Sequence, residues 1–405
     1  MVKMEIIFKE SIKPYSKTPD HLRTYRLSML DQFIPPSFYI PLILYYPHDE
    51  STSSVKQAEI SSLLKRSLSH ALSLYYPLAG RMTSENSVDS SDQGVDFFET
   101  QVDAQLSEIL KSPKVEVLTQ FVPHTSEKGG FLLGIQLNHF NCGGIAIGIS
   151  LCHRIADGCT LSMFVKAWAT IARGDSNTVA PSFITSSLFQ PKEQSGKPMS
   201  FESPRHWADT RRFCFSSSKI QTLRDEAGTA FQPTRVELVM AAIWKWAMNR
   251  KGRDQCRQLW AGHAVNIRGR MEPPLSECVF GNLVQAAVAL GNRELNLGEL
   301  VNKMREATGK IDREFLEELQ GKNGYDMAVR NTKKWSSDKE VGHIIFSSWC
   351  RFPFRESDFG WGKPVWASSA SWAAPNVVVL MDSMSDVGGI EAWFTMAEDD
   401  ACDEM

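Results

Sequence analysis

The sequence predicts an α/β (α+β) protein with two domains, on three observations. The chain has 405 residues, which is more than one hydrophobic core usually organises. Predicted strands and predicted helices alternate in both halves of the chain. A stretch over 181–205, rich in Ser, Pro, Lys and Gln, separates the halves. We therefore expect an N-terminal domain over 1–180, a linker over 181–205 and a C-terminal domain over 206–405.

Apolar patterns predict the elements of the N-terminal half. Residues at helical spacing predict a helix over 54–74. FLLGIQLNHF predicts a strand over 131–140, and NCGG is typical of the turn that follows it. IAIGISLCH predicts a strand over 145–153 that is buried on both faces, because no polar residues alternate along it. One apolar face over 161–172 predicts a helix, with Gly174 at the position of a C-terminal cap.

The C-terminal half alternates in the same way. RRFCFSSSKIQTLRDEA, which begins at Arg211, predicts a strand followed by a helix. TRVELVMAAIWKWAMNR predicts a buried helix over Thr234–Arg250. The proline-rich segment Met271–Glu277 interrupts this half. We find no repeat with a period of 20–50 residues, so a solenoid is not expected.

Composition excludes several classes of protein. The formal net charge is -3, so there is no basic excess for nucleic-acid binding. No apolar stretch approaches the ~20 residues of a membrane helix, and charges interrupt the N-terminus too early for a signal peptide. The 8 cysteines include no CxxC pair, which indicates free thiols and no metal site. We expect a cytoplasmic protein that binds neither nucleic acid nor membrane.

The segment HRIADG contains the strongest candidate for chemistry. His153 ends a predicted buried strand, and Asp157 follows it by four residues. A histidine has an ordinary pKa of ~6.5 and can serve as a general base near neutral pH. Three interpretations remain open from these residues alone. His153 is a core histidine, it shares a metal with Asp157, or it is a base in a cleft while Asp157 has a structural role.

A second motif, SDFGWGKP, lies over Ser357–Pro364. Its glycines and Asp358 favour a tight loop, and its Phe and Trp provide large apolar anchors. The DFG triplet also occurs in protein kinases. This chain has no HRD catalytic loop before it and no glycine-rich phosphate loop with a lysine, which argues against a kinase.

Together, HRIADG and DFGWG resemble the paired motifs of the BAHD family of plant acyl-CoA-dependent acyltransferases. Further matches occur in the expected order, namely LSMLDQ (27–32), YYPLAGR (75–81), VNIRGRMEPPL (265–275) with FGN after it, and SSWCRFPF (347–354). The resemblance covers nearly the whole chain. It is strongest to the branch of alkaloid and terpenoid alcohol acetyltransferases.

The resemblance implies a fold and a reaction. The fold is two chloramphenicol-acetyltransferase-like domains, each a mixed β-sheet flanked by helices, with a channel between them. In the reaction, His153 takes the proton of a small-molecule alcohol, and the oxygen attacks the thioester of acyl-CoA, with acetyl-CoA as the favoured donor. No acyl-enzyme forms, so Cys152 is only a neighbour of the base. No cofactor is permanently bound, and the family habit is monomeric. N-acylation of an amine and a non-catalytic, ligand-binding member of the fold remain the alternatives.

The resemblance also implies roles for further residues. The indole N–H of Trp361 is a possible donor to the oxyanion of the tetrahedral intermediate. Asp157 points away from the substrate and pairs with Arg268, which shapes the turn that carries His153. In the DFGWG loop, Asp358, Gly360 and Gly362 are structural. The expected acyl-CoA contacts are Thr234, Ser347, Ser348 and Trp349.

Overall fold

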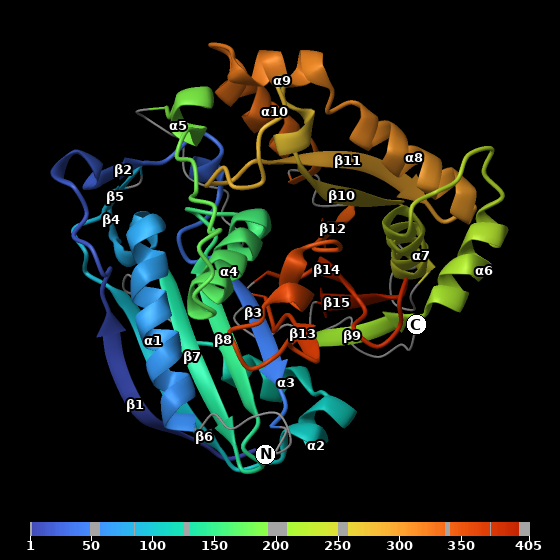
Figure 1. Ribbon diagram of the computed structural model, residues 1–405. Helices are drawn as coiled ribbons and strands as arrows, with labels where there is room; N and C mark the ends of the chain where they lie inside the picture. Colours follow the sequence, from blue (N-terminus) through green and yellow to red (C-terminus); the bar gives the residue numbers. More distant parts are fainter. Residues whose placement is uncertain are drawn as a thin grey trace. The chain divides into compact units, whose positions relative to one another are not determined.

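The computed structural model describes residues 2–48, 57–84, 86–124, 130–192, 209–249, 258–336, 341–372 and 374–396 (Figure 1). The chain divides into two compact units. The first comprises Met1–Ser200, Glu277–Asn282 and Phe352–Ser371. The second comprises Phe201–Ser276, Leu283–Arg351 and Trp372–Met405.

The first unit is built on a six-stranded mixed sheet. The strands in spatial order are β1 (Met4–Ile12), β6 (Val95–Val102), β7 (Leu133–Phe140), β8 (Ile145–Cys152), β3 (Tyr39–Tyr46) and β13 (Trp366–Ser368). β6 and β7 are parallel, and the other neighbours are antiparallel. Every residue of β7 and β8 is buried. The sequence-based prediction of a strand at this place, buried on both faces, is confirmed.

Two helices, α1 (Gln57–Leu74) and α4 (Gly158–Ala172), cover this sheet side by side (Figure 1). The indole N–H of Trp168 on α4 donates to the Leu64 carbonyl oxygen at 3.3 Å and to Ser67 Oγ at 3.0 Å on α1. Gly174 follows α4 with a φ of 77°, the left-handed conformation of a C-terminal cap. The unit also contains three short helices and a small sheet, namely α2 (Leu106–Lys111), α3 (Val115–Leu118), α5 (Thr185–Leu188), β2 (Thr24–Arg26), β5 (Ser87–Asp89) and β4 (Arg81–Ser84).

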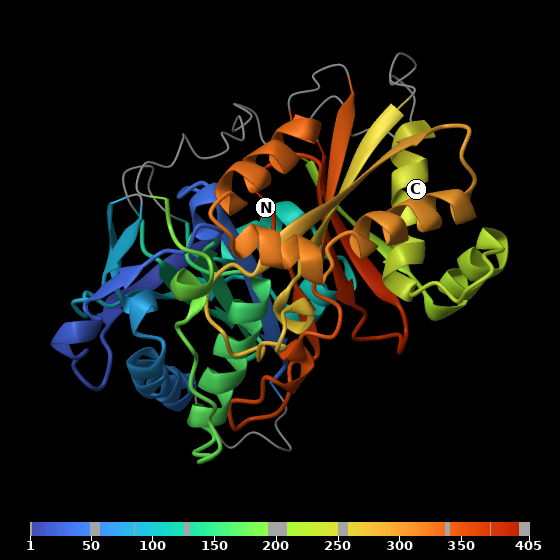
Figure 2. The same ribbon diagram turned by 90° about the horizontal axis from the view of Figure 1, so that it is seen from above.

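The second unit has its own six-stranded mixed sheet. In spatial order the strands are β11 (Val284–Asn292), β10 (Gln258–Asn266), β12 (Gly342–Ser348), β14 (Val377–Asp382), β15 (Ile390–Met396) and β9 (Asp209–Phe215). β10, β12 and β14 run parallel. Its helices are α6 (Ser217–Ala227), α7 (Arg235–Asn249), α8 (Leu297–Gly309), α9 (Arg313–Gln320) and α10 (Gly324–Ser336). Figure 2 shows α6, α7 and α8 gathered on one side of the strands, and Trp244 on α7 donates to the Leu259 carbonyl oxygen of β10 at 3.1 Å.

The DFGWG motif does not lie where the sequence predicted it. It belongs to the first unit and not to a C-terminal domain over 206–405. The physical reason is backbone pairing. β13 follows DFGWG in the chain and pairs with β3, with Trp366 opposite Tyr45. The FGN segment joins the same unit, since Phe280 N–H donates to the carbonyl oxygen of Ser182 at 2.9 Å. Of the predicted linker, 193–205 lies outside the described residues.

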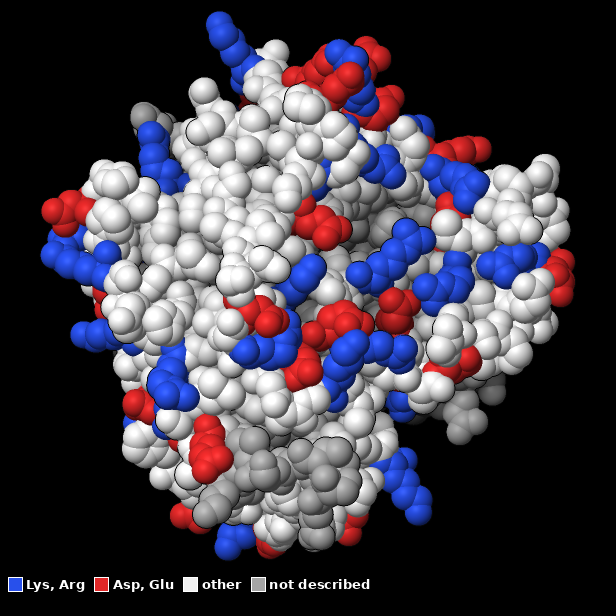
Figure 3. Space-filling view, in the orientation of Figure 1, with Lys and Arg blue, Asp and Glu red and all other residues white. Residues whose placement is uncertain are grey.

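Surface charge and helix length add two observations. Lys and Arg side chains are interspersed with Asp and Glu side chains on the face that Figure 3 shows, in line with a net charge of -3. Among the helices of the described ranges, none is long and apolar enough to cross a membrane.

Candidate active site

His153 lies directly after the last residue of β8, at one end of the sheet of the first unit. Its backbone N–H donates to the Phe38 carbonyl oxygen at 2.8 Å, which continues the pairing of β8 with β3 by one step. The imidazole stacks on the Phe38 ring, with 5.9 Å between centroids and 25° between planes. The histidine is therefore held by a rigid strand on one side and by α4 on the other.

The side chain of Asn282 fixes the tautomer of His153. The Nδ2 group of Asn282 donates to the His153 carbonyl oxygen at 2.8 Å and to Asp31 Oδ1 at 2.8 Å. Because these partners only accept, the amide oxygen of Asn282 must be the atom that faces His153 Nδ1, at 3.0 Å. Nδ1 therefore carries the hydrogen, and Nε2 keeps a lone pair that can accept a proton.

Burial keeps this imidazole neutral. Desolvation lowers the pKa of His153 below its ordinary value. Hydrogen bonds to the backbone of His153 and Ala156 and to the Asn282 side chain, with the negative charge of Asp157, oppose the shift only in part. At neutral pH the side chain is thus in the form that a general base requires.

Asn282 is itself held by its neighbours in the FGN segment. Phe280 packs among the rings of Tyr25, Tyr75 and Phe183, with centroids 5.6, 6.3 and 5.2 Å away. Gly281 has a φ of 119°, which an L side chain rarely adopts. Its N–H donates to Thr160 Oγ1 at 3.3 Å, and its carbonyl oxygen accepts from the same hydroxyl at 3.1 Å. The segment is thereby tied to the first turn of α4.

Asp31 completes the group behind the histidine. Its Oδ1 accepts from the backbone N–H of Asn282 at 3.0 Å as well as from the Asn282 amide. Its Oδ2 accepts from the N–H and the hydroxyl of Ser28, both at 2.7 Å. The carboxyl is fully buried. Burial raises its pKa to about 6, although these hydrogen bonds favour the charged form.

Asn282 and Asp31 were not among the site residues expected from the sequence. Both lie in stretches that match the family, FGN and LSMLDQ, so the signal was present. The contact between Asn282 and His153 joins residues that are 129 positions apart in the sequence. The contact between Asp31 and Asn282 joins residues that are 251 positions apart. No pattern within one segment of the sequence predicts a hydrogen bond between segments so far apart.

Asp157 is the N-cap of α4. Its Oδ1 accepts from the backbone N–H of Thr160 at 2.8 Å, and the side chain is fully buried. Arg268, in the second unit, is also buried, and its Nη1 donates to Asn266 Oδ1 at 3.2 Å. The pairing of Asp157 with Arg268 stays a prediction.

Cys152, next to the base, is a poor nucleophile. Its thiol is buried and donates to the Pro36 carbonyl oxygen at 3.6 Å. Burial raises the pKa of this thiol to about 11, so the thiolate is scarce at neutral pH.

The DFGWG loop forms a tight structural turn. Asp358 Oδ1 accepts from the N–H groups of Gly360 and Gly362 at 2.8 and 3.0 Å. Both glycines have positive φ angles, 112° and 110°. Phe359 is fully buried, 4.9 Å from the Trp168 ring of α4. These contacts explain the loop by packing and capping within the first unit.

The structure separates Trp361 from His153, against the sequence-based expectation of an oxyanion donor. The indole lies 5.9 Å from the Tyr46 ring, at one end of β3. Tyr39, at the other end of β3, pairs with Cys152 beside the base. Seven residue steps at ~3.3 Å each separate the two ends by about 23 Å. The geometry does not support an oxyanion role for Trp361.

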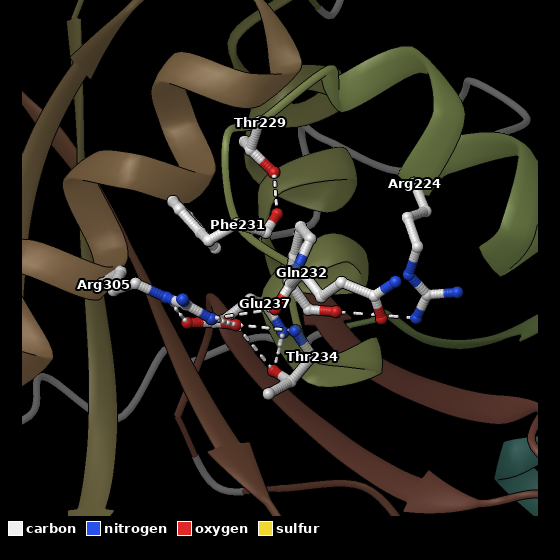
Figure 4. A network of polar contacts seen from close by, with 8 residues as sticks. Arg224, Thr229, Phe231, Gln232, Thr234, Glu237 and Arg305 are labelled. Carbon is white, nitrogen blue, oxygen red and sulfur yellow. Dashed lines mark hydrogen bonds and ion pairs between the residues drawn. The ribbon is translucent and has the colours of Figure 1, made fainter.

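Thr234 occupies the N-cap position of α7. Its N–H and hydroxyl donate to Glu237 Oε2 at 2.7 and 2.9 Å, and Glu237 in turn pairs with Arg305 at 2.7 Å (Figure 4). Its polar groups therefore serve the helix start. Contact of Thr234 with acyl-CoA stays a prediction.

The other expected acyl-CoA contacts lie at the end of β12. Ser347 and Ser348 are half-buried there, and Trp349 follows them. The backbone N–H of Trp349 donates to the Leu380 carbonyl oxygen at 2.7 Å, and its buried ring lies 6.0 Å from that of Trp372. Contact with acyl-CoA stays a prediction for all three.

Known proteins resemble this chain along almost its whole length. The family model described as "Transferase family" matches residues 2–401. Stemmadenine O-acetyltransferase of Catharanthus roseus is 36% identical over 413 residues, 98% of this chain and 95% of that protein. Vinorine synthase of Rauvolfia serpentina is 35% identical, with coverage of 98% and 95%.

Solved structures agree with these relatives. The crystal structure of vinorine synthase matches with a TM-score of 0.86 at 34% identity, over 98% of this chain and 96% of that one. The TRI101 structure of F. sporotrichioides matches with a TM-score of 0.71 at 18% identity, over 94% and 97%, which supports the fold alone.

Two mixed sheets flanked by helices, together with these relatives, define an acyltransferase with two chloramphenicol-acetyltransferase-like domains. The chain belongs to the Transferase family, the BAHD acyltransferases, with vinorine synthase-like acetyltransferases among its relatives. The resemblance inferred from HRIADG, DFGWG and the intervening motifs is confirmed.

Proposed function

We propose that this acyltransferase transfers an acetyl group from acetyl-CoA to a hydroxyl of a plant specialised metabolite such as an alkaloid or terpenoid. The names of its relatives support this substrate class. They include stemmadenine O-acetyltransferase of Catharanthus roseus and limonoid 1-O-acetyltransferase of Citrus sinensis, both 36% identical. Acetyl-CoA serves as a co-substrate and not as a resident cofactor.

In the proposed reaction both substrates are bound together. Nε2 of His153 takes the proton of the acceptor hydroxyl while the oxygen attacks the thioester carbon. The tetrahedral intermediate collapses, the C–S bond breaks, and the CoA sulfur takes the proton from the imidazolium. The products are the acetyl ester and free CoA. No side chain carries the acyl group, in keeping with the buried, protonated thiol of Cys152.

One observation carries this proposal. The Nδ1 of His153 is committed to the amide oxygen of Asn282, and burial lowers the pKa of the ring. These two features leave Nε2 as a neutral acceptor at physiological pH.

The test is the release of free thiol from acetyl-CoA with a panel of alcohols and amines. We expect alcohols to support turnover in the wild type. His153→Ala should lower kcat by about 10²- to 10⁴-fold, the usual worth of a general base. The matched control is His70→Ala, because His70 is exposed on α1 and stacks on Tyr15.

Each outcome decides between the alternatives. Turnover by His153→Ala at the rate of His70→Ala would exclude His153 as the base. Turnover with amines alone would replace the O-acyltransferase by an N-acyltransferase. Absence of thiol release across the whole panel would favour a non-catalytic member of the fold. The monomeric state and the cytoplasmic location stay predictions.

A further inference from the structure

We propose that Asp31 is a positioning residue for His153, acting through the side-chain amide of Asn282. The inference rests on the proposed role of His153 as the base. The contacts form an unbroken series within the first unit, from the Asp31 carboxylate to the Asn282 Nδ2 group at 2.8 Å, and from the Asn282 Oδ1 atom to His153 Nδ1 at 3.0 Å.

Asp31 first sets the orientation of the amide. If the amide of Asn282 were flipped, its oxygen would face the Asp31 carboxylate and the His153 carbonyl oxygen, each now 2.8 Å from Nδ2. Acceptors would then oppose acceptors at both contacts, and two buried hydrogen bonds would be lost. In that arrangement the amide nitrogen would face Nδ1 and favour the wrong tautomer, with the hydrogen on Nε2.

Asp31 also places a negative charge one amide group behind the imidazole. The carboxylate is fully buried and accepts from four donors, two on Ser28 and two on Asn282. When Nε2 takes the acceptor proton, the imidazolium donates through Nδ1 to an amide that the carboxylate polarises. In a buried site such a chain of hydrogen bonds strengthens each of its members. The charge therefore stabilises His153 in the state that follows proton transfer.

Several other ionisable groups surround this chain. The phenol of Tyr25 on β2 stays neutral, because burial first, and then the charges of Asp31 and Tyr76, raise its pKa well above the ordinary value. Burial also raises the pKa of Tyr76. Arg154 is buried and donates to the Ile34 carbonyl oxygen at 2.6 Å. The negative charge of Asp157 also acts on His153 and raises its pKa.

The decisive variant is Asp31→Asn, which keeps the shape and removes the charge. We expect kcat to fall about 10- to 100-fold, part of the worth of a general base, with KM within about threefold. We also expect the acid limb of kcat/KM to move to lower pH, because an imidazolium without the nearby carboxylate forms less readily. A residue with a structural role alone would not move that limb.

Ser28→Ala should shift the acid limb of kcat/KM in the direction opposite to that of Asp31→Asn. This variant keeps the carboxylate but removes the hydroxyl that donates to Asp31 Oδ2. The charged form of Asp31 loses a hydrogen bond, its pKa rises, and the acid limb should move to higher pH. Because Ser28→Ala removes a single hydroxyl, we expect this variant to fold. It therefore tests the role of Asp31 even if the Asp31→Asn variant does not fold.

The matched control is Asp92→Asn. Asp92 also accepts from one residue through a backbone N–H and a hydroxyl, those of Thr18, at 3.0 and 2.6 Å. Its contacts lie with Thr18 and not with Asn282, and we expect wild-type kinetics. Wild-type kcat and an unmoved acid limb in folded Asp31→Asn, or an unmoved limb in Ser28→Ala, would overturn the inference. The His153→Ala variant tests the base directly. If His153→Ala is inactive while the Asp31 and Ser28 variants keep the wild-type kcat and acid limb, only the role of Asp31 is contradicted.

Discussion

The Nδ1 atom of His153 and the Oδ1 atom of Asn282 lie 3.0 Å apart, although 129 residues separate them in the sequence. This contact determines which nitrogen of the proposed base carries the hydrogen. Asn282 belongs to the first unit together with its neighbours Phe280, which packs on Tyr25, and Gly281, whose carbonyl oxygen accepts from the Thr160 hydroxyl.

Removal of this contact should impair catalysis more than binding. In Asn282→Ala the imidazole loses its orienting acceptor, and buried Asp31 loses the donor on Nδ2. We expect kcat to fall about 10- to 100-fold with little change in KM, and stability to fall by about 1–3 kcal/mol because a buried acceptor is left unsatisfied. Steady-state kinetics and thermal unfolding measure both effects.

Asn141→Ala is the matched control for that variant. The Asn141 amide also donates to a carboxylate, that of Asp103 at 2.9 Å, but on the surface. It should behave as wild type. A folded Asn282→Ala enzyme with kcat within twofold of the control would contradict the orienting role.

Two substitutions at Asp157 separate a helix cap from a buried charge pair. Asparagine caps a helix as well as aspartate does, whereas alanine costs about 1 kcal/mol at an N-cap. If the predicted pairing with Arg268 holds, Asp157→Asn leaves a buried cation without its carboxylate, at about 3–5 kcal/mol. We expect Asp157→Asn, Asp157→Ala and Arg268→Ala all to lose activity. Normal turnover by Asp157→Asn would leave Asp157 as a cap alone.

Trp361→Phe tests the distance between the DFGWG loop and the base. The phenyl ring should keep the stacking on Phe359, 5.6 Å between centroids. The indole N–H has no hydrogen-bond partner among the described residues, so its removal breaks no described bond. We expect full activity and near wild-type stability. Loss of an oxyanion donor would instead reduce kcat by about 10²- to 10³-fold, and such a loss would return Trp361 to the catalytic site.

The pH dependence of the wild type should show one acid limb. Burial lowers the pKa of His153 below 6.5 and raises that of Asp31 to about 6. Above these values His153 is neutral and Asp31 is charged, so kcat/KM should be flat at neutral pH. As the pH falls below about 6, Asp31 takes a proton, and His153 takes one at its own lowered pKa, so kcat/KM should decline. A decline that begins above pH 7 would show that the base titrates as a group with a raised pKa.

Much of the local structure was predictable, because it depends on patterns within one segment. The uninterrupted apolar run of β8, the apolar face of α4 and the capping glycine at Gly174 all appear as expected. The motifs also identified the family, because their order along the sequence does not depend on where the fold places them.

The remaining features depend on contacts that sequence position conceals. DFGWG lies near the C-terminus, yet β13 places it beside β3. The same pairing puts Trp361 near Tyr46, at the end of β3 away from His153, and the motif alone gave no information on this separation. The link from Asp31 through Asn282 to His153 joins three segments, and hydrogen bonds between distant segments leave no periodicity to detect.

The tautomer of His153 can be measured directly from the ¹⁵N NMR spectrum of its ring in histidine-labelled protein at neutral pH, assigned with the His153→Gln variant. We expect a neutral ring with a protonated Nδ1 and a pyridine-like Nε2. An imidazolium, or a neutral ring with its hydrogen on Nε2, would contradict it.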